Sequence, residues 1–505
     1  MTHDLVTGFC TPEAAGLSST DVLRCLRELD ASGNEIHGFV AARHGRIFAE
    51  SYLAPYGVEI PHTCHSMGKS YTCTAVGVAC TEGLLNPDDR VVDVFAEEIA
   101  RFGAKPDENM KKMRLRHLMT MSCGMARMPA MDEHWMENFL QSPVEYEPGT
   151  RFLYNSIGSC MLGAAVEKVT GRELEPYLRE KLFSRIGIGP NDLVWRRFGN
   201  GRFAEPGIAA TTRSNLRLGL LYLAQGVADG QPIVSREWMR QAVRKQIETA
   251  EGPAQGDGVC GYGWQLWMCK QPGMVRFDGG QGQFCIMDLH RDTVVAIHEG
   301  GWHPNGVQKV LDCTEALMAG ARDEALPENP EAYRALKAYL DARAVAPAAA
   351  LPVPAEASGF TGSYAITEGV FNPWLEVAPV DEDFYHLFYA PSIRPEIVVF
   401  DLAVEAERVT LTLNQNTVLH AWLDGRWRRE ETATVMPPLK HYAATALFVD
   451  AHTLRISLRW LNGWCRPVLT LRLSGASDLE ILCEKEMLHE GRAPFTRRAK
   501  ARKTR

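Results

Sequence analysis

A serine and a lysine stand three residues apart in the segment His65-Ser66-Met67-Gly68-Lys69, which leads through a mostly small and apolar stretch to Gly83. This pattern predicts a helix closed by a glycine, with Ser66 and Lys69 on the same face. A serine hydroxyl becomes a nucleophile when a neighbouring base takes its proton, and a lysine is such a base only when neutral. An unperturbed lysine is neutral in roughly one molecule in 2500 at pH 7, so burial or a nearby cation must favour the neutral amine. Taken alone, the spacing also fits an exposed helical serine and lysine.

Two further segments contain turn-forming residues and could contribute to the same site as Ser66 and Lys69. Residues 147–156 read Glu-Pro-Gly-Thr-Arg-Phe-Leu-Tyr-Asn-Ser, which predicts a turn, a short extended piece and then a helix that ends at Gly171. Residues 276–284 read Arg-Phe-Asp-Gly-Gly-Gln-Gly-Gln-Phe and lie between two strand-like stretches. Ser66, at a helix start, would also offer its own N–H to a developing oxyanion.

These three segments, in this order, resemble those of the serine β-lactamase and penicillin-binding-protein superfamily, in particular its class C β-lactamase-related branch of esterases, D-amino-acid peptidases and amide hydrolases. The resemblance covers roughly residues 15 to 325, and the stretches LRHLMTMSCGM from Leu115 and Gly261-Tyr262-Gly263-Trp264 support it. It implies an α/β (α+β) fold in which an antiparallel sheet is flanked by helices and accompanied by a helical region.

The resemblance also implies roles for individual residues of the first two segments. Ser66 matches the acylated nucleophile and Lys69 its proton acceptor, while Tyr154 matches the tyrosine that relays a proton to the leaving group. Ser156 stands where many relatives have asparagine, and its shorter side chain can still hydrogen-bond Lys69 or the substrate.

In the third segment, Gly280 matches the residue whose N–H completes the oxyanion hole, and Gly279 permits a close approach of the strand. Where the peptidases and β-lactamases have Lys or His followed by Thr or Ser, this chain has Phe277 and Asp278. An apolar ring and an anion would repel a substrate carboxylate. We therefore expect a neutral ester or amide, or an acyl compound with an amine that Asp278 could pair. A turn carboxylate facing water is the alternative for Asp278.

Metal and redox chemistry are not expected. The segment His62-Thr63-Cys64-His65 contains zinc-type ligands, but no second pair follows at a finger-like spacing, so we predict no metal and no cofactor. His298 and His303 follow a strand close to the third segment and could line the cleft, cap an element or lie at the surface. The thirteen cysteines show no regular frame, which indicates mostly reduced thiols.

Composition divides the chain into two domains. Beyond the alanine- and proline-rich stretch, Val409, Leu411 and Leu413 alternate with threonines, and a second alternating run passes through Asn462-Gly463 into a third, which favours an antiparallel hairpin. The predicted divisions are a hydrolase domain over 1–325, an Ala/Pro-rich linker over 326–357, an antiparallel, barrel-like β domain over 358–487 and a basic disordered tail over 488–505.

The net charge of -8 argues against a nucleic-acid partner, and no apolar run approaches the length that spans a bilayer, so no membrane association is expected. The N-terminal residues lack the pattern of a signal peptide, which favours a cytoplasmic location. The predicted function is a serine hydrolase acting on a small-molecule ester or amide, with the C-terminal domain as a candidate for oligomer assembly. The alternatives are a D-amino-acid-specific peptidase or amidase, a penicillin-binding protein, or a sensor that is acylated without turnover.

Overall fold

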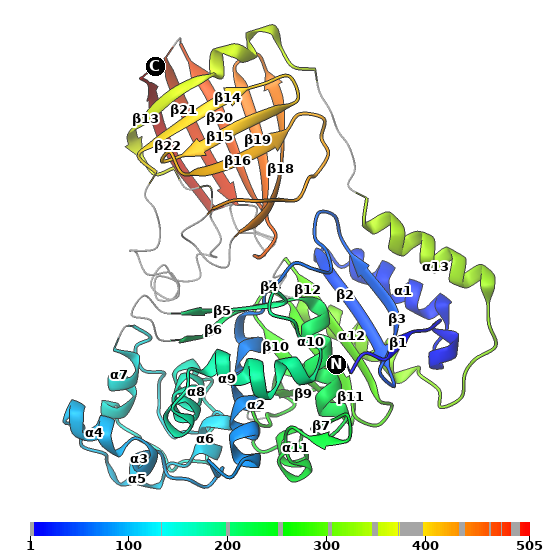
Figure 1. The fold of residues 1–505 in the computed structure, drawn as a ribbon, viewed down its shortest axis with the longest axis vertical. Coiled ribbons are helices and arrows are strands. Elements are labelled where there is room, and N and C mark those ends of the chain that lie inside the picture. The colour runs from blue at the N-terminus through cyan, green and yellow to red at the C-terminus, as the bar shows by residue number, and fades with distance from the viewer. Residues whose placement is uncertain are drawn as a thin grey trace.

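The structure is a computed structural model of the chain. It describes residues 5–504 except 133, 198–202, 251–255, 301–305, 346–351, 372, 374–396, 434–439, 464–465, 476 and 486–494. A mixed body of helices and strands and a separate β-barrel make up the molecule (Figure 1).

The mixed body is built on a seven-stranded sheet. Its strands, in spatial order, are β1 (Gly8–Phe9), β3 (Arg46–Tyr52), β2 (Ile36–Arg43), β12 (Thr293–Glu299), β11 (Gln283–Asp288), β10 (Met274–Gly279) and β9 (Trp267–Met268). All neighbours pair antiparallel except β1 and β3, which are parallel. The central strands β2, β12 and β11 are buried along their whole length, as expected for strands covered on both faces. The expected α/β (α+β) fold with an antiparallel sheet is confirmed.

Helices cover both faces of this sheet. On one face, α1 (Ser19–Asp30) and α12 (Gly306–Ala319) share an apolar core with the sheet, and α13 (Pro330–Arg343) packs against α1. On the other face, α10 (Thr212–Leu223) contacts β2, β11 and β12. In the described part of the chain, no helix is both long and apolar enough to cross a bilayer.

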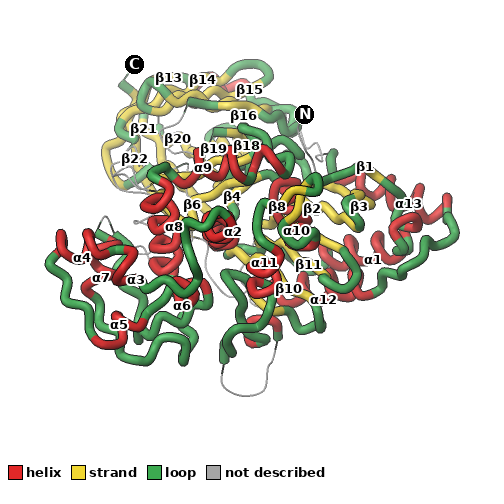
Figure 2. Tube along the Cα trace, turned by 60° about the horizontal axis from the view of Figure 1, so that its bottom comes forward, coloured by secondary structure: helices red, strands yellow, loops and turns green. Residues whose placement is uncertain are grey.

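Helix α2 (Gly68–Thr81) occupies the centre of the mixed body. Its residues from Gly68 to Ala79 are all buried, which is typical of an interior helix rather than an amphipathic surface helix. Figure 2 shows it between the sheet and the helical region. The glycine predicted to end it, Gly83, has the left-handed φ of 75°. The helical region contains α3 (Val91–Val94), α4 (Ala96–Phe102), α5 (Glu108–Lys112), α6 (Leu115–Met119), α7 (Trp135–Gln141), α8 (Ser156–Thr170) and α9 (Leu174–Lys181).

A closed barrel forms the C-terminal domain. Its strands, in chain order, are β13 (Gly362–Gly369), β14 (Val399–Val404), β15 (Arg408–Leu413), β16 (Thr417–Trp422), β17 (Glu430–Glu431), β18 (His441–Asp450), β19 (Thr453–Trp460), β20 (Pro467–Ser474), β21 (Asp478–Lys485) and β22 (Phe495–Lys503). The ring closes where β16 pairs with β18. The alternation seen in the sequence is confirmed, because Val409, Leu411 and Leu413 are buried, and β19 and β20 form the predicted antiparallel pair.

The prediction of a disordered basic tail over 488–505 is wrong for its described part. Residues Phe495–Lys503 form β22, which pairs with β13 and β21. Ala499 and Ala501 point into the barrel, while Lys500 and Arg502 lie outside and pair with Glu368 and Asp478. The alternation of period two is present in the sequence, but its inward side chains are too small to reveal it.

The predicted linker over 326–357 also contains regular structure. Helix α13 lies within it, capped by Asn329, whose side chain accepts from the Ala332 N–H. Arg343 forms an ion pair with Asp30 of α1, and its guanidinium donates to the Ile36 carbonyl at 2.7 Å. The connector is therefore shorter than predicted, because α13 belongs to the mixed body.

Candidate active site

Ser66 and Lys69 lie together at the start of the central helix. Ser66 is in the 3-10 turn η2 (His65–Met67) directly before α2, and Lys69 is in the first turn of α2. Lys69 Nζ donates to Ser66 Oγ at 3.1 Å, and the lysine is only 1% exposed. The exposed-helix alternative is therefore wrong.

Tyr154 reaches the same point from the second segment. Its ring centroid lies 5.0 Å from Lys69 Nζ, at the end of the extended piece that precedes α8. The tyrosine ring stacks on Trp267 of β9, with centroids 5.9 Å apart and planes at 21°. Tyr154 is thus held between the lysine and an aromatic wall that belongs to the sheet.

Ser156 is the first residue of α8 and is buried. The helix is capped by Asn155, whose side-chain oxygen accepts from the Gly158 N–H at 3.1 Å. Asn155 is therefore used for capping, and the assignment of Ser156 to Lys69 or to the substrate stays a prediction.

The end of β10 lies directly against the nucleophile turn. A Cβ added to Gly279 would stand 2.1 Å from the Cys64 carbonyl oxygen and 3.1 Å from the Met67 nitrogen, so only glycine fits there. Gly280 follows immediately, and a Cβ there would meet nothing closer than His65 at 4.0 Å. The structure thus places Gly280 beside the turn that carries Ser66, where the resemblance requires an oxyanion donor.

Gly279→Ala is expected to lower the rate of Ser66 acylation by about 100-fold or more, because the methyl group forces the strand end away from backbone atoms of the nucleophile segment. Gly280→Ala keeps the N–H and places its methyl group in open space, so a much smaller loss is expected. Labelling rates with a fluorophosphonate probe would compare the two variants. Equal labelling rates for the two variants would contradict the close approach of Gly279 to the backbone of Cys64 and Met67.

Phe277 and Asp278 point to opposite sides of β10. The ring of Phe277 is fully buried and packs edge-on against Tyr222 at 4.9 Å, which does not support the expectation that it repels a substrate carboxylate. Asp278 has a side chain that is 23% exposed and accepts from Arg276 Nε at 2.8 Å. Burial raises the pKa of Asp278, although the Arg276 guanidinium opposes this. The alternative of a free turn carboxylate does not hold, because Asp278 lies on a strand and is paired.

Two residues that hold the site together were not singled out by the sequence. Trp267 positions Tyr154, and the dense run of aromatic residues from Tyr262 to Trp267 is the signal that could have indicated it. Gln265 is buried, and its side chain accepts from Ser159 Oγ of α8 and donates to an α6 carbonyl. Its backbone carbonyl accepts from Ser70 Oγ of α2 at 2.7 Å. Gln265 therefore ties the nucleophile helix to the helix that follows Tyr154.

Two of the histidines considered as ligands or cleft residues, His62 and His298, are interior groups. His62, in β4 (His62–Thr63), donates from Nδ1 to the Thr63 carbonyl, and its ring lies 4.5 Å from that of His298. His298 donates from Nδ1 to Gln283 at 2.7 Å. Burial lowers the pKa of His298 to about 3 and that of His62 well below its usual value. His303 lies outside the described residues.

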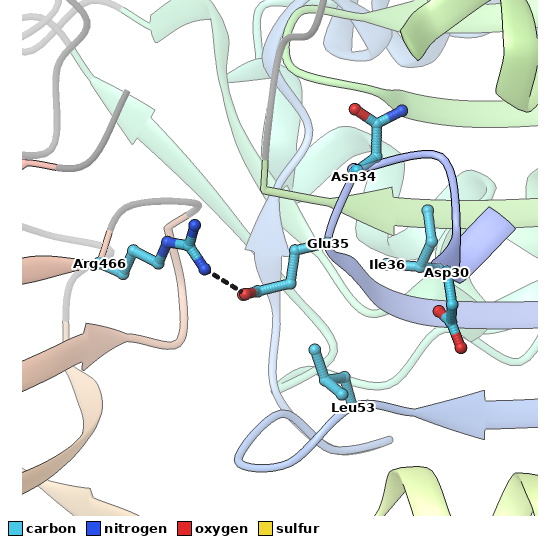
Figure 3. A pocket seen from close by; sticks show the side chains of 7 residues that line it. Asp30, Asn34, Glu35, Ile36, Leu53 and Arg466 are labelled. Carbon is cyan, nitrogen blue, oxygen red and sulfur yellow. Dashed lines mark hydrogen bonds and ion pairs between the residues drawn. The ribbon is translucent and has the colours of Figure 1, made fainter. Parts of the chain in front are cut away.

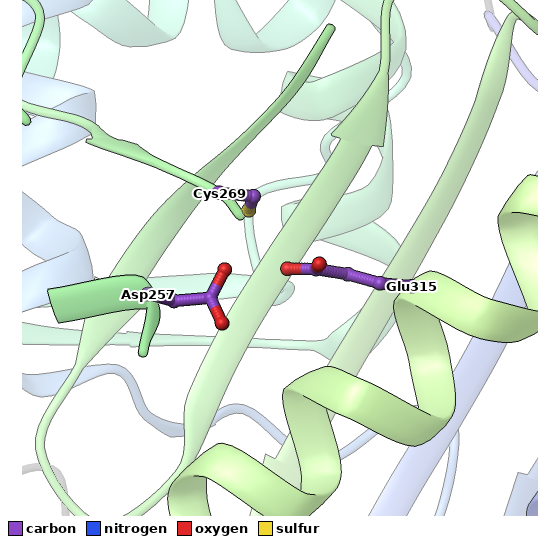
Figure 4. Close-up of side chains that lie close together, drawn as sticks. All are labelled: Asp257, Cys269 and Glu315. Carbon is purple, nitrogen blue, oxygen red and sulfur yellow. The ribbon is translucent and has the colours of Figure 1, made fainter. Parts of the chain in front are cut away.

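One cluster has the side-chain types of a metal site. Ligand atoms of Asp257, Cys269 and Glu315 lie within 4.8 Å of one another, and all three residues are buried (Figure 4). Burial, assisted by Asp257, raises the pKa of Glu315 to about 8, so a protonated Glu315 can donate to Asp257. A guanidinium nitrogen of Arg276 lies 3.9 Å from Cys269 Sγ, so a cation already stands beside the thiol. The raised pKa of Glu315 and the Arg276 cation beside the thiol offer an explanation of the cluster without a metal, and the absence of a metal stays a prediction.

Comparisons with known proteins show which family the chain belongs to. The model of the Beta-lactamase family matches residues 26–312, which is more than half of the chain. The 6-aminohexanoate-dimer hydrolase of Paenarthrobacter ureafaciens is 24% identical over 309 residues, covering 56% of this chain and 78% of the relative. A putative D-alanyl-D-alanine carboxypeptidase of Escherichia coli (strain K12) is 29% identical over 124 residues, which span 21% of this chain and only 28% of that protein.

Solved structures are also similar to this chain. A putative 6-aminohexanoate-dimer hydrolase from Bacillus anthracis has a TM-score of 0.49 at 18% identity and covers 60% of this chain and 83% of its own. The octameric penicillin-binding protein homologue from Pyrococcus abyssi has a TM-score of 0.46 at 16% identity and covers 94% of this chain and 98% of its own. By the match of the family model, the chain belongs to the β-lactamase family of serine hydrolases.

Proposed function

We propose that this protein hydrolyses a small ester or amide through an acyl-enzyme on Ser66. The observation that carries the proposal is the buried Lys69 amine, whose Nζ lies 3.1 Å from Ser66 Oγ. Burial in general disfavours an ammonium ion, and the proposal requires Lys69 to be neutral when it accepts the proton. The names of the relatives, which include a 6-aminohexanoate-dimer hydrolase and a putative D-alanyl-D-alanine carboxypeptidase, support a hydrolase.

The positions of these groups support the following reaction as part of the proposal. Lys69 takes the Oγ proton as Ser66 attacks the carbonyl carbon, and the N–H groups of Ser66 and Gly280 stabilise the oxyanion. The carbon–oxygen or carbon–nitrogen bond then breaks, and Tyr154 passes the proton to the leaving group. Water then attacks the acyl-enzyme and gives its proton to Lys69, and the acid and the free serine are released.

The test compares the wild-type protein with Ser66→Ala. We expect labelling by a fluorophosphonate probe at Ser66, and a loss of labelling and turnover by about 1000-fold or more in the variant. Chromogenic esters, D-amino-acid amides and a cephalosporin form the substrate panel, and a preference for the amides would favour the peptidase alternative. An acyl group that persists on the wild type would favour a sensor. Full activity of Ser66→Ala would refute the mechanism.

Asp278 supports a further proposal, that the substrate carries no carboxylate next to β10. Asp278 and Arg276 lie on the same face of the strand as an ion pair, and Arg276 also lies over Trp267, which stacks on Tyr154. A carboxylate brought to this side would face Asp278, whereas a neutral or amine-bearing group would not be repelled.

Asp278→Asn is expected to raise kcat/KM for carboxylate-bearing esters by about tenfold relative to matched amine-bearing esters, because it removes the repelling charge and leaves Arg276 unpaired. The measurement is the ratio of the two specificity constants in the wild type and the variant. An unchanged ratio would contradict a role for Asp278 in substrate choice.

A further inference from the structure

The chain directly before the nucleophile turn is held by the barrel. The loop between β19 and β20 places Asn462 against it, and this residue is only 2% exposed. The Thr63 N–H donates to the Asn462 backbone carbonyl at 2.8 Å, and Asn462 Nδ2 donates to the Pro61 carbonyl at 2.7 Å. These bonds lie three and five positions before Ser66, so the second domain directly contacts the segment that carries the nucleophile.

The barrel fixes the orientation of this asparagine. Asn462 Oδ1 accepts from the N–H groups of Lys440 at 3.0 Å and His441 at 2.8 Å, at the start of β18. Both ends of the amide are therefore used, one inside the barrel and one across the interface. Because these hydrogen bonds already hold the Asn462 side chain in one rotamer, it loses little further conformational freedom when it binds the Pro61 carbonyl.

Apolar packing accompanies the hydrogen bonds. Leu461, next to Asn462, is fully buried and forms a cluster with Tyr56 and Ile60 of the mixed body. This cluster excludes water from the interface, which strengthens the neighbouring polar contacts.

A second group of contacts reaches the same segment through charged and aromatic side chains. Arg459 and Arg466 of the barrel both pair with Glu35. Arg466 lies 2.7 Å from the Glu35 carboxylate, and Figure 3 shows the two side chains facing each other. Glu35 Oε1 lies 3.0 Å from His37 Nε2, and His37 Nδ1 lies 2.9 Å from His62 Nε2. His62 in turn donates to the Thr63 carbonyl, so this route also ends at the segment that Asn462 contacts.

Residues 61–64 contact a neighbouring strand on each of two sides. Strand β4 of this segment pairs with β6 (Phe203–Ala210), and the Cys64 carbonyl lies under Gly279 at the end of β10. A displacement of residues 61–64 would therefore shift Ser66 relative to both Lys69 and Gly280. Misplacement by about 1 Å can cost about 100-fold in rate.

We infer that the barrel is part of the machinery that positions Ser66, and that Asn462 is a positioning residue acting through Pro61 and Thr63. The inference rests on the proposed acyl-enzyme function and deepens it. It gives the C-terminal domain a role at the nucleophile that does not require any barrel residue to touch the substrate.

Asn462→Asp is the decisive variant. A carboxylate keeps an oxygen for the Lys440 and His441 N–H groups but replaces the donor that faces the Pro61 carbonyl with an acceptor. The expected result is a fall in kcat and in the Ser66 labelling rate by about tenfold or more, with KM within about twofold of the wild-type value. Asn414→Asp is the matched control. Asn414 Oδ1 also accepts from two backbone N–H groups, those of Val398 and Val399, and this contact lies within the barrel domain. This variant is expected to label at the wild-type rate.

Glu35→Gln tests the second group of contacts, which runs from the barrel through Glu35 to His62. It also tests the inference if the Asn462→Asp variant does not fold. We expect a several-fold slower labelling rate, and in the double variant a loss smaller than the product of the two single losses, because both act on one segment. Wild-type labelling rates in the folded variants, with only a lowered Tm, would overturn the inference and leave the proposed function intact. Absence of Ser66 labelling in the wild type would overturn the proposed function itself.

Discussion

Lys69→Met should lower kcat and the labelling rate of Ser66 by about 1000-fold or more, the largest effect expected for any side chain other than Ser66 itself. Methionine has a similar length and suits the buried position, which is 1% exposed, so the fold should persist while the proton acceptor is lost. The Oγ proton then has no base at 3.1 Å. Stopped-flow measurement of acylation with a chromogenic ester gives the rate directly.

Lys69→Arg separates the base from the charge. A guanidinium keeps the cation but does not lose its proton at neutral pH, so it cannot act as the base. We expect this variant to be as slow as Lys69→Met. Recovery of a substantial part of the wild-type rate by arginine would show that the lysine acts through its positive charge, and the assignment as base would be wrong.

Acidification from pH 7 to pH 5 should remove several kcal/mol of the stability that depends on three histidines whose pKa values are lowered in the folded state. Burial lowers the pKa of His298 to about 3, that of His117 to about 4 and that of His62 well below its usual value. These histidines stay neutral in the folded state while their unfolded counterparts take up protons below pH 6.5. Stability is therefore fully present above pH 6.5 and is lost as the pH falls toward the folded pKa values, by up to about 2 kcal/mol for each histidine at pH 5.

Urea unfolding at a series of pH values measures this loss. Replacing His298 with asparagine should reduce the slope of unfolding free energy against pH by up to about 1.4 kcal/mol per pH unit, which corresponds to one proton. His134→Asn is the control, because the His134 side chain is 75% exposed and therefore solvated in both states. A slope that does not change when His298 is replaced would contradict the neutral assignment of this buried histidine.

The Ser66–Lys69 pair could be predicted from the sequence because the two residues are close along the chain. Ser66 and Lys69 are separated by less than one helical turn, so helix geometry alone brings them together. Tyr154 and Gly280 are distant along the chain, and their places in the site followed from the resemblance rather than from spacing. Trp267 and Gln265 could not be found in either way, since each acts through contacts between elements that no local pattern records.

The errors about the second half of the chain have a common physical origin. Helix α13 was missed because it is mostly exposed, and the Asn329 cap and the Arg343 contacts with α1 and β2, rather than a strong apolar stripe, hold it in place. Strand β22 was missed because its two buried residues, Ala499 and Ala501, are small. The contribution of a side chain to a pattern depends on its size, whereas its contribution to a sheet depends on backbone hydrogen bonds that every residue except proline can make.

The place of β22 between β13 and β21 has a consequence for biosynthesis. The first and last strands of the barrel in chain order are hydrogen-bonded neighbours, so the ring can close only after residue 503 has been synthesised. The sheet of the first domain is complete at Glu299, well before that point, and can fold as a unit while synthesis continues. If the barrel positions Ser66 as inferred, a nascent chain would hold a folded first domain whose Ser66 is not yet fully positioned, and the full hydrolytic rate would be reached only after residue 503 has been made.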